Sequence, residues 1–368
     1  MSIPEVVHEL MLETTPAVSV IVPAYNGERT ILRTISSIIR QDQASLELIV
    51  VDDGSKDSTS CLVDDFIKKA GFSGHYSLVR HEQNLGLSRS LNDAIQQCHA
   101  PYILILHQDC EFVSDNWVSR AVSLMKDESV AIVTGYYGLS DAEDETFVKR
   151  AFGVLRKQFH SRPEVSCEEA TFSEGKCDLY RKDYLLKAGG FPTGYRIAGE
   201  DLIVSYTLRS IGYKILKCYD LPVIQRFTGA AESFNGNLGK EFLFGKVMGG
   251  VFSKFKLFLF KGAKNSLYSG SRSLHRASQP IFVFALVFSV IASLFLVWWF
   301  LLIACTLFLF RVFYYIERVY KELQVYQNRV RYMKIECVGI ALIGVLTDIA
   351  YTLGFTYGLA MHELGRRL

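Results

Sequence analysis

The sequence predicts an α/β fold, a mainly parallel sheet flanked by helices, followed by apolar helices near the C-terminus. Within the first 140 residues, short apolar runs rich in β-branched residues alternate with helical stretches, which is the pattern of parallel strands joined by crossover helices. Residues 281–310 then carry no charge, and residues 337–361 are apolar apart from Asp348. Because ~20 apolar residues span a bilayer, these segments predict attachment to a membrane.

The order of the elements follows from these patterns. Strands are expected at 17–25, 46–51, 76–80, 102–106 and 130–137. Helices are expected at 28–40, 57–70, 87–98, 115–127 (capped by Ser114) and 201–211, the last leading into a further strand.

The strand at 102–106 runs directly into five residues that differ sharply from it, His107, Gln108, Asp109, Cys110 and Glu111. A carboxylate at the tip of a buried strand is costly to desolvate unless something pairs with it. Polar groups also follow the first two strands, at 23–26 and 52–57. In parallel sheets, ligands bind beyond the carboxyl ends of the strands, so these three tips predict a binding site at one edge of the sheet.

Charge is distributed unevenly along the 368 residues, although the net charge is only +2. Residues 1–239 carry 24 basic and 32 acidic side chains, whereas residues 240–276 carry eight basic side chains and one acid. An acidic folded part excludes nucleic acid as a partner. The basic segment mixes Phe with Lys and is expected to lie in the interface of an anionic membrane.

These features predict four regions. They are an N-terminal extension (1–16), an α/β domain (17–229), a basic interfacial amphipathic segment (230–280) and a transmembrane region (281–368). The eight cysteines form no CxxC pair and no metal-ligand spacing, so free thiols in a reducing compartment are expected.

Two to three membrane spans are expected. One long span over 281–310 would place the six basic residues between Arg311 and Lys334 outside, against the positive-inside tendency. A hairpin of two short spans over 279–316 avoids this and is favoured. The expected location is the cell membrane, with several passes and the α/β domain facing the cytoplasm. Asp348 in the last apolar block is either functional or a polar contact between helices.

Seven segments, in order, resemble glycosyltransferase family 2, an inverting group with the GT-A fold, over roughly residues 17–220. They are VSVIVPAYN (18–26), Gln41, IVVDDGSKDST (49–59), NLGLSRSLN (84–92), YILILHQD (102–109), LLKAGGF (185–191) and GEDLIVSYTLRSIGYKI (199–215). The resemblance implies an enzyme that uses a nucleotide-diphosphate sugar (UDP-, GDP- or TDP-sugar).

The resemblance also implies roles for the polar tips. Asp53 would contact the base and Asp52 would help to position the loop, while Pro23 and Tyr25 would wall the base. Gln108 is a further candidate for donor binding. The alternative for the Asp pair is a turn in which an acid caps the following helix.

Asp109 matches the last carboxylate of the family's DXD element, which holds Mg²⁺ or Mn²⁺ against the donor diphosphate. His107 stands where the first Asp of that element is expected, which departs from the family pattern. His107 is either a second metal ligand, which would suit Mn²⁺, or a packing residue.

Asp201 matches the family's general base, with Glu200 orienting the loop or binding the acceptor. The alternative is a helix N-terminus that favours acids through its dipole. A base suits a hydroxyl acceptor on a lipid-linked glycan. Direct transfer to a polyprenyl or dolichyl phosphate and an inactive nucleotide-sugar-binding scaffold in the membrane are the competing hypotheses.

Overall fold

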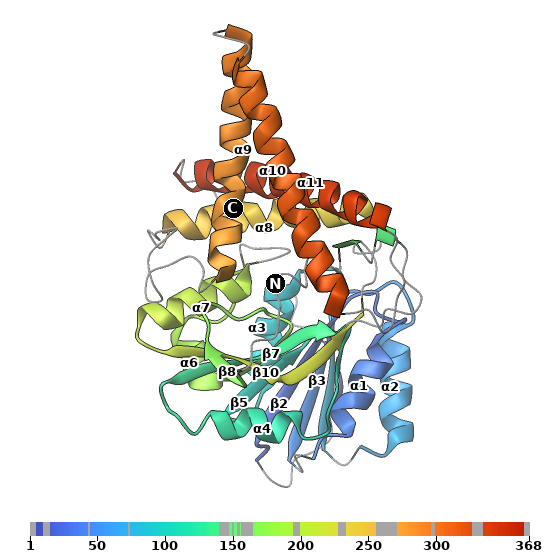
Figure 1. The fold of residues 1–368 in the computed structure, drawn as a ribbon. Coiled ribbons are helices and arrows are strands. Elements are labelled where there is room, and N and C mark those ends of the chain that lie inside the picture. Colours follow the sequence, from blue (N-terminus) through green and yellow to red (C-terminus); the bar gives the residue numbers. More distant parts are fainter. Residues whose placement is uncertain are drawn as a thin grey trace. The chain divides into compact units, whose positions relative to one another are not determined.

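A computed structural model of the chain consists of two units (Figure 1). The sheet unit comprises Met1–Ser140 and Arg162–Arg226, and the helical unit comprises Asp141–Ser161 and Phe227–Leu368. The structure describes residues 5–9, 15–42, 45–72, 74–139, 147–148, 151–152, 155, 165–193, 199–226, 233–254, 271–295, 299–325 and 334–363.

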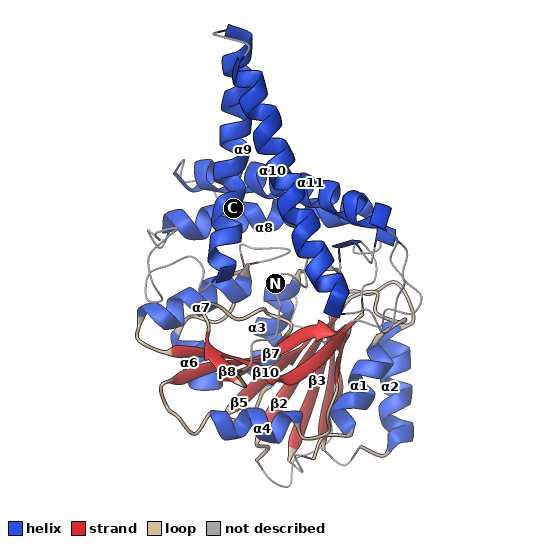
Figure 2. Cartoon of the chain, in the orientation of Figure 1, coloured by secondary structure: helices blue, strands red, loops and turns tan. Residues whose placement is uncertain are grey.

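Ten strands of the sheet unit form one sheet (Figure 2). Their bounds are β1 Glu5–Glu9, β2 Val18–Ala24, β3 Leu46–Asp52, β4 His75–Arg80, β5 Tyr102–Leu106, β6 Cys110–Phe112, β7 Val130–Leu139, β8 Cys167–Glu169, β9 Cys177–Arg181 and β10 Lys214–Gln225. The order across the sheet is β1-β4-β3-β2-β5-β9-β7-β10-β6, and β8 pairs with β10.

The four strands β4, β3, β2 and β5 are all parallel, which confirms the predicted fold class. Antiparallel strands lie on both sides of these four strands. β1 pairs with β4, and β9 lies between β5 and β7, antiparallel to both. β9 was not expected as part of the sheet, because it lies far along the chain from both neighbours.

Helices cover both faces of the sheet, as predicted. They are α1 Ile31–Ile39, α2 Thr59–Ala70, α3 Leu87–Gln97, α4 Trp117–Leu124, α6 Lys182–Lys187 and α7 Glu200–Ser210. One apolar core joins the sheet to α1, α2 and α4, and a second joins it to α3, α6 and α7. The Ser114 cap was wrong, since Asn116 is the N-cap of α4 and its side chain makes no capping hydrogen bond.

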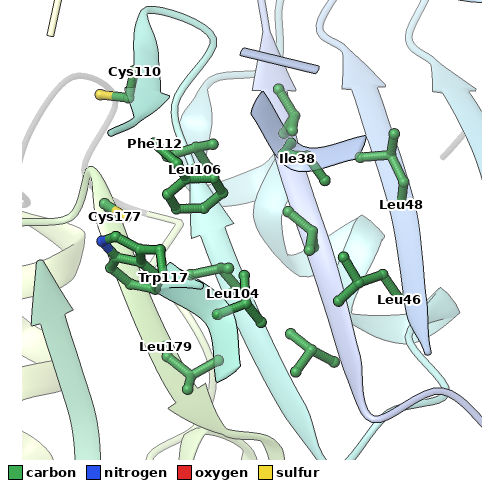
Figure 3. Close-up of a cluster of buried hydrophobic side chains, with 14 of the residues drawn as sticks. Ile38, Leu46, Leu48, Leu104, Leu106, Cys110, Phe112, Trp117, Cys177 and Leu179 are labelled. Carbon is green, nitrogen blue, oxygen red and sulfur yellow. The ribbon is translucent and has the colours of Figure 1, made fainter. Parts of the chain in front are cut away.

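The first of these cores shows why the strands could be predicted from the apolar pattern of the sequence (Figure 3). Leu46 and Leu48 of β3 and Leu104 and Leu106 of β5 alternate with residues of the opposite face, and all four are buried. Trp117 closes this core at α4 and is fully buried. Both faces of these strands are therefore apolar, as expected for parallel strands covered by helices on both sides.

Cys167 and Cys218 form a disulfide between β8 and β10, so the prediction that all cysteines are free was wrong for this pair. The two residues are 51 positions apart in sequence and directly opposite in the antiparallel register. Sequence spacing could not reveal that pairing. The other six cysteines are free, as predicted.

The helical unit contains four long helices among its described residues, α8 Phe234–Lys254, α9 Ser271–Phe295, α10 Trp299–Val325 and α11 Lys334–Glu363. Within the described part, one stretch is long and apolar enough to cross a membrane, Cys337–His362 of α11, with mean hydropathy 1.8. Ser278–Ala292 of α9 is a shorter apolar helix. The number of spans and the 230–280 and 281–368 boundaries stay predictions.

Helices α8 and α11 pack so closely that the backbone of each contacts glycines of the other. Each contributes two glycines spaced four residues apart, where a Cβ would clash with a carbonyl oxygen of the other helix: Gly245 and Gly249 on α8, and Gly354 and Gly358 on α11. Gly245 meets Tyr351 and Gly249 meets Phe355, so the contacts advance in the same direction and the helices run parallel. Small residues at this spacing are typical of close helix packing in membranes.

Replacing Gly249 with Ala should therefore destabilise the helical unit, because the added methyl group meets the backbone of α11. Overpacking of this kind costs about 1–3 kcal/mol. Gly239→Ala in the same helix is the matched control, since a Cβ there meets open space and Ala favours a helix. Thermal unfolding in detergent measures both, and equal unfolding temperatures for the two variants would contradict the close approach.

Candidate active site

The loops that follow β2 and β3 are joined by hydrogen bonds. The backbone N–H of Asn26 donates to Ser55 Oγ at 2.9 Å, and that of Gly27 donates to Thr59 Oγ1 at 2.8 Å. In return, the backbone N–H of Lys56 donates to Asn26 Oδ1 at 2.9 Å. The two loops therefore form one rigid surface at the carboxyl edge of the sheet.

Asp52 is fully buried beneath this surface. Its Oδ1 accepts a hydrogen bond from the Ser55 backbone N–H at 2.9 Å, and its Oδ2 accepts one from the Ser60 hydroxyl. Both carboxylate oxygens are thus engaged by the turn and by the first turn of α2. This geometry suits the predicted role of Asp52 in positioning the loop.

Asp53 fixes a second loop, the one after β4. Its Oδ1 lies 2.8 Å from both His81 Nδ1 and the Leu85 backbone nitrogen, and its Oδ2 accepts the Gly86 N–H at 2.9 Å. Burial alone would raise the pKa of Asp53, but the hydrogen bonds from His81, Leu85 and Gly86 outweigh burial and lower that pKa. Asp53 is therefore a stable carboxylate at the predicted base-binding edge.

Tyr25 and Gln108 link the tips of β2 and β5. The Gln108 side-chain amide pairs with the Tyr25 backbone through two hydrogen bonds of 3.0 Å. A Cβ at Gly27 would clash with that amide, so a larger residue there would displace the Gln108 side chain from these hydrogen bonds. Tyr25 is 44% exposed. Pro23, two residues before it, is buried and lies opposite Val51 in the parallel pairing of β2 with β3.

Asp109 and His107 lie in the turn between β5 and β6. Asp109 Oδ2 accepts a hydrogen bond from Gln225 Nε2 at 3.0 Å, whereas Oδ1 has only a weak contact of 3.6 Å with Cys110 Sγ among the described residues. Burial lowers the pKa of His107 to about 4, so its imidazole is neutral at physiological pH. His107 Nε2 is buried without a hydrogen-bond partner in the described part of the chain.

Asp201 and Glu200 open α7, and Gly199 precedes them with φ 102°. Burial, together with the charges of Glu200 and Asp178, raises the pKa of Asp201 well above its usual value. Burial likewise raises the pKa of Glu200 to about 7. These acids therefore hold protons far more tightly than exposed carboxylates do, which is typical of catalytic acids and bases.

The turn that precedes β9 brings the two predicted centres together. His107 donates its backbone N–H to Lys176 O at 3.0 Å, and a Cβ on the adjacent Gly175 would lie 2.9 Å from Asp201 Oδ2. The Lys176 ammonium in turn donates to Gln225 Oε1 at 2.6 Å, beside Asp109. The metal candidates and the base candidates thus flank one turn.

Three residues of this region were not predicted as site residues, namely Lys176, Asp178 and Gln225. Asp178 is fully buried on β9, where it accepts hydrogen bonds from Gly175 N–H at 2.9 Å and Tyr180 Oη at 3.1 Å. An acid inside the apolar run of that strand was the available signal. That signal did not indicate Asp201 as a neighbour, because only the tertiary fold brings Asp178 and Asp201 together.

Parts of the chain are similar to known proteins. Residues 19–189 match the profile of Glycosyl transferase family 2. An uncharacterized glycosyltransferase of Haemophilus influenzae is 30% identical over 149 residues, which is 40% of this chain and 43% of the relative. The Escherichia coli enzyme WfgD, a UDP-Glc:alpha-D-GlcNAc-diphosphoundecaprenol beta-1,3-glucosyltransferase, is 31% identical over 120 residues, 33% of this chain and 45% of the relative. The chain thus spans less than half the length of these two relatives.

A solved structure extends the likeness beyond the sheet unit. The mannosyltransferase PcManGT from Pyrobaculum calidifontis, in complex with GDP-Man and Mn²⁺, superposes with a TM-score of 0.53 over 92% of this chain and 87% of its own. At 17% sequence identity, this likeness shows a shared fold. The family model matches residues 19–189, a little under half of the chain, and the shared fold is GT-A-like.

Proposed function

We propose that the chain is a membrane-attached, inverting glycosyltransferase that moves a sugar from a nucleotide-diphosphate sugar to a hydroxyl of a lipid-linked glycan. One observation carries the proposal. An acid of raised pKa, Asp201, and a carboxylate suited to a divalent cation, Asp109, flank the same turn at Gly175–Lys176. This pairing would supply a proton acceptor and a site for a diphosphate leaving group on the two sides of that turn.

The donor nucleotide would lie against the joined loops after β2 and β3. Tyr25, with Pro23 beside it, offers a partly exposed aromatic wall for the base. The ionised carboxylate of Asp53 can accept hydrogen bonds from base N–H groups, and Asp52 and Gln108 hold the loops in place. The names of the two similar proteins include GDP-Man and UDP-Glc, which supports a GDP- or UDP-sugar; a TDP-sugar is the third candidate.

Asp109 and His107 would hold Mg²⁺ or Mn²⁺. Asp109 Oδ1, which has only a weak contact, and His107 Nε2, which has no hydrogen-bond partner among the described residues, would supply one oxygen and one nitrogen ligand. An imidazole ligand favours Mn²⁺ over Mg²⁺. When bound, the cation would neutralise the charge of the departing nucleoside diphosphate. Gln225 keeps the Asp109 carboxylate oriented through the hydrogen bond to Oδ2.

Asp201 would remove the proton from the acceptor hydroxyl as its oxygen attacks the anomeric carbon. The bond to the diphosphate breaks on the opposite face, so the configuration inverts. A raised pKa strengthens Asp201 as a base once it is ionised. Burial and the charges of Glu200 and Asp178 raise that pKa. Glu200, next to Asp201, would orient the loop or bind the acceptor.

Membrane attachment rests on the helical unit. Cys337–His362 of α11 meets the length and composition of a span, and α9 and α10 expose many large apolar side chains, including Phe284, Phe288, Leu309 and Phe310. Exposed apolar surface of this extent marks contact with a membrane or a partner. We extend the proposal to attachment to the cell membrane, with the sheet unit in the cytoplasm and a lipid-linked acceptor.

Replacing Asp201 with Asn should lower the rate of sugar transfer by about 10²–10⁴-fold, because the acceptor proton loses its base. The assay is release of nucleoside diphosphate from UDP-, GDP- and TDP-sugars in the presence of lipid-linked glycans extracted from bacterial or archaeal membranes. Asp183→Asn is the matched control, since Asp183 also lies in the first turn of a helix but is exposed and pairs with Lys187. Near-normal turnover by the Asp201 variant would favour direct transfer to a polyprenyl phosphate, whose oxygen needs no base.

The activity should fall on acidification at a much higher pH than for an ordinary carboxylate. Asp201 accepts a proton only when ionised, and its pKa is raised by burial and by Glu200, so kcat/KM should rise with pH through this elevated pKa. Glu200→Gln removes one neighbouring charge and should move the acid limb to lower pH. A limb that stays in place in this variant, or that lies near pH 4 in the unmodified protein, would argue against Asp201 as the base.

Replacing Asp109 with Asn should raise the Mn²⁺ concentration needed for half-maximal activity by about tenfold or more, because the site loses its charged ligand. Glu111→Gln provides the control. Glu111 lies two residues away but pairs with Arg226 at 3.1 Å, so its loss should leave the Mn²⁺ requirement unchanged. Titration of activity with Mn²⁺ and with Mg²⁺ measures both variants, and equal responses would remove Asp109 from the metal site.

A further inference from the structure

The helical unit contains a buried polar cluster centred on Asp348 of α11, which is fully buried. Its Oδ1 accepts hydrogen bonds of 2.7 Å from Gln279 Nε2 and Tyr315 Oη, and its Oδ2 accepts one of 2.7 Å from Arg311 Nε. These partners come from α9 and α10. The Asp348 carboxylate is therefore well supplied with donors, and Arg311 balances its charge.

Arg311 has donors that this cluster does not use. Its side chain gives Nε to Asp348 and Nη1 to Ser278 Oγ at 3.1 Å. Arg311 is only 6% exposed. Its Nη2 atom is buried and has no hydrogen-bond partner among the described residues. A buried N–H group without an acceptor is unfavourable, so the Nη2 group requires an acceptor.

A second guanidinium lies on the same face of α10. Arg318 follows Arg311 by seven residues, which is about two helical turns, and its Nη1 is also buried without a partner in the described part. The two guanidinium carbons lie 5.0 Å and 5.3 Å from the centroid of the Tyr314 ring. Two cations thus share one aromatic ring. The buried acid Asp348 offsets Arg311, whereas Glu317, the other acid whose charge acts on Tyr314, is exposed to solvent. This cluster therefore suits an anion.

The position of these residues along α10 indicates which anion they meet. α9 and α10 lie side by side in Figure 1, and Arg311 contacts Ser278 and the ring of Phe282 on α9, so the two helices form an antiparallel pair. From Trp299 to Phe310, α10 carries no charge and exposes large side chains such as Leu302 and Leu309.

Those twelve uncharged residues of α10 are about 18 Å long at 1.5 Å per residue. That length is little more than half of the ~30 Å hydrocarbon core of a bilayer. With its apolar end inside the bilayer, α10 therefore brings Arg311 to the depth at which the hydrocarbon gives way to lipid phosphates. Tyr314 and Arg318, both partly exposed, follow directly on the headgroup side.

We propose that Arg311 and Arg318, with Tyr314 between them, bind the phosphate group of a membrane lipid. A guanidinium presents a planar fork of N–H donors that matches phosphate oxygens, and a phosphate at this point would accept from both Nη groups that lack partners. The site lies wholly within the helical unit and does not depend on sugar transfer. An ordinary phospholipid and a polyprenyl phosphate carry the same group, so either could be the ligand.

Binding is tested on the full chain in a neutral detergent. Dioctanoyl phosphatidic acid should bind at least about tenfold more tightly than dioctanoylglycerol, which lacks the phosphate, and more tightly than inorganic phosphate, which lacks the acyl chains. Equal binding of dioctanoylglycerol or of inorganic phosphate would overturn a lipid-phosphate site. Farnesyl phosphate separates the two sources, because tighter binding than phosphatidic acid indicates a polyprenyl ligand and equal binding indicates a general headgroup site.

Three variants test the residues. Arg318→Gln should weaken phosphatidic acid binding by about tenfold, and it leaves the Asp348 cluster intact. Arg311→Lys keeps a positive charge for Asp348 but removes the fork, so binding should weaken severalfold with the unfolding temperature little changed. Glu317→Gln is the control, since Glu317 is an exposed acid on the same helix, and its loss should not weaken binding. Unaltered binding by both arginine variants would overturn the proposal.

Discussion

A carboxylate removed from water needs hydrogen-bond donors, and this requirement organises the carboxyl edge of the sheet. Asp53 meets it with three donors drawn from the loop after β4, and Asp52 meets it with the turn and α2. Each buried acid thereby ties a loop to the strand that carries it. The surface proposed for the nucleotide is rigid because these carboxylates are satisfied.

The acids near the turn before β9, Asp178, Glu200 and Asp201, differ from Asp52 and Asp53 in their hydrogen bonding. Asp178 Oδ1 and Glu200 Oε2 are buried without hydrogen-bond partners among the described residues, and the carboxylates raise one another's pKa. Asp178 accepts hydrogen bonds on Oδ2 from Gly175 and Tyr180, yet burial still raises its pKa, so burying these acids would cost stability if they had no other use. The contrast with Asp53, whose pKa is lowered, separates the acids that fix loops from those suited to proton transfer.

How much the sequence could predict depends on the range of the interactions. The strands at the centre of the sheet and the tips that carry Asp53 and Asp109 were predictable, because local apolar periodicity defines both. The place of β9, the pairing of Cys167 with Cys218 and the contact of Gly175 with Asp201 were not. Each joins segments separated widely along the chain, and no local pattern records which distant strand supplies a partner. The proposed roles of the site residues remain predictions.

In the helical unit, the buried groups that lack hydrogen-bond partners are guanidinium N–H donors rather than carboxylate oxygens. Asp348 has all the donors that it needs, so the excess lies with Arg311 and Arg318, whose N–H groups outnumber the acceptors around them. A polar contact between helices, one of the two roles expected for Asp348, accounts for the acid but not for the second guanidinium. An acceptor from outside the protein would complete the cluster, and a lipid phosphate is the acceptor found where an apolar helix leaves the bilayer.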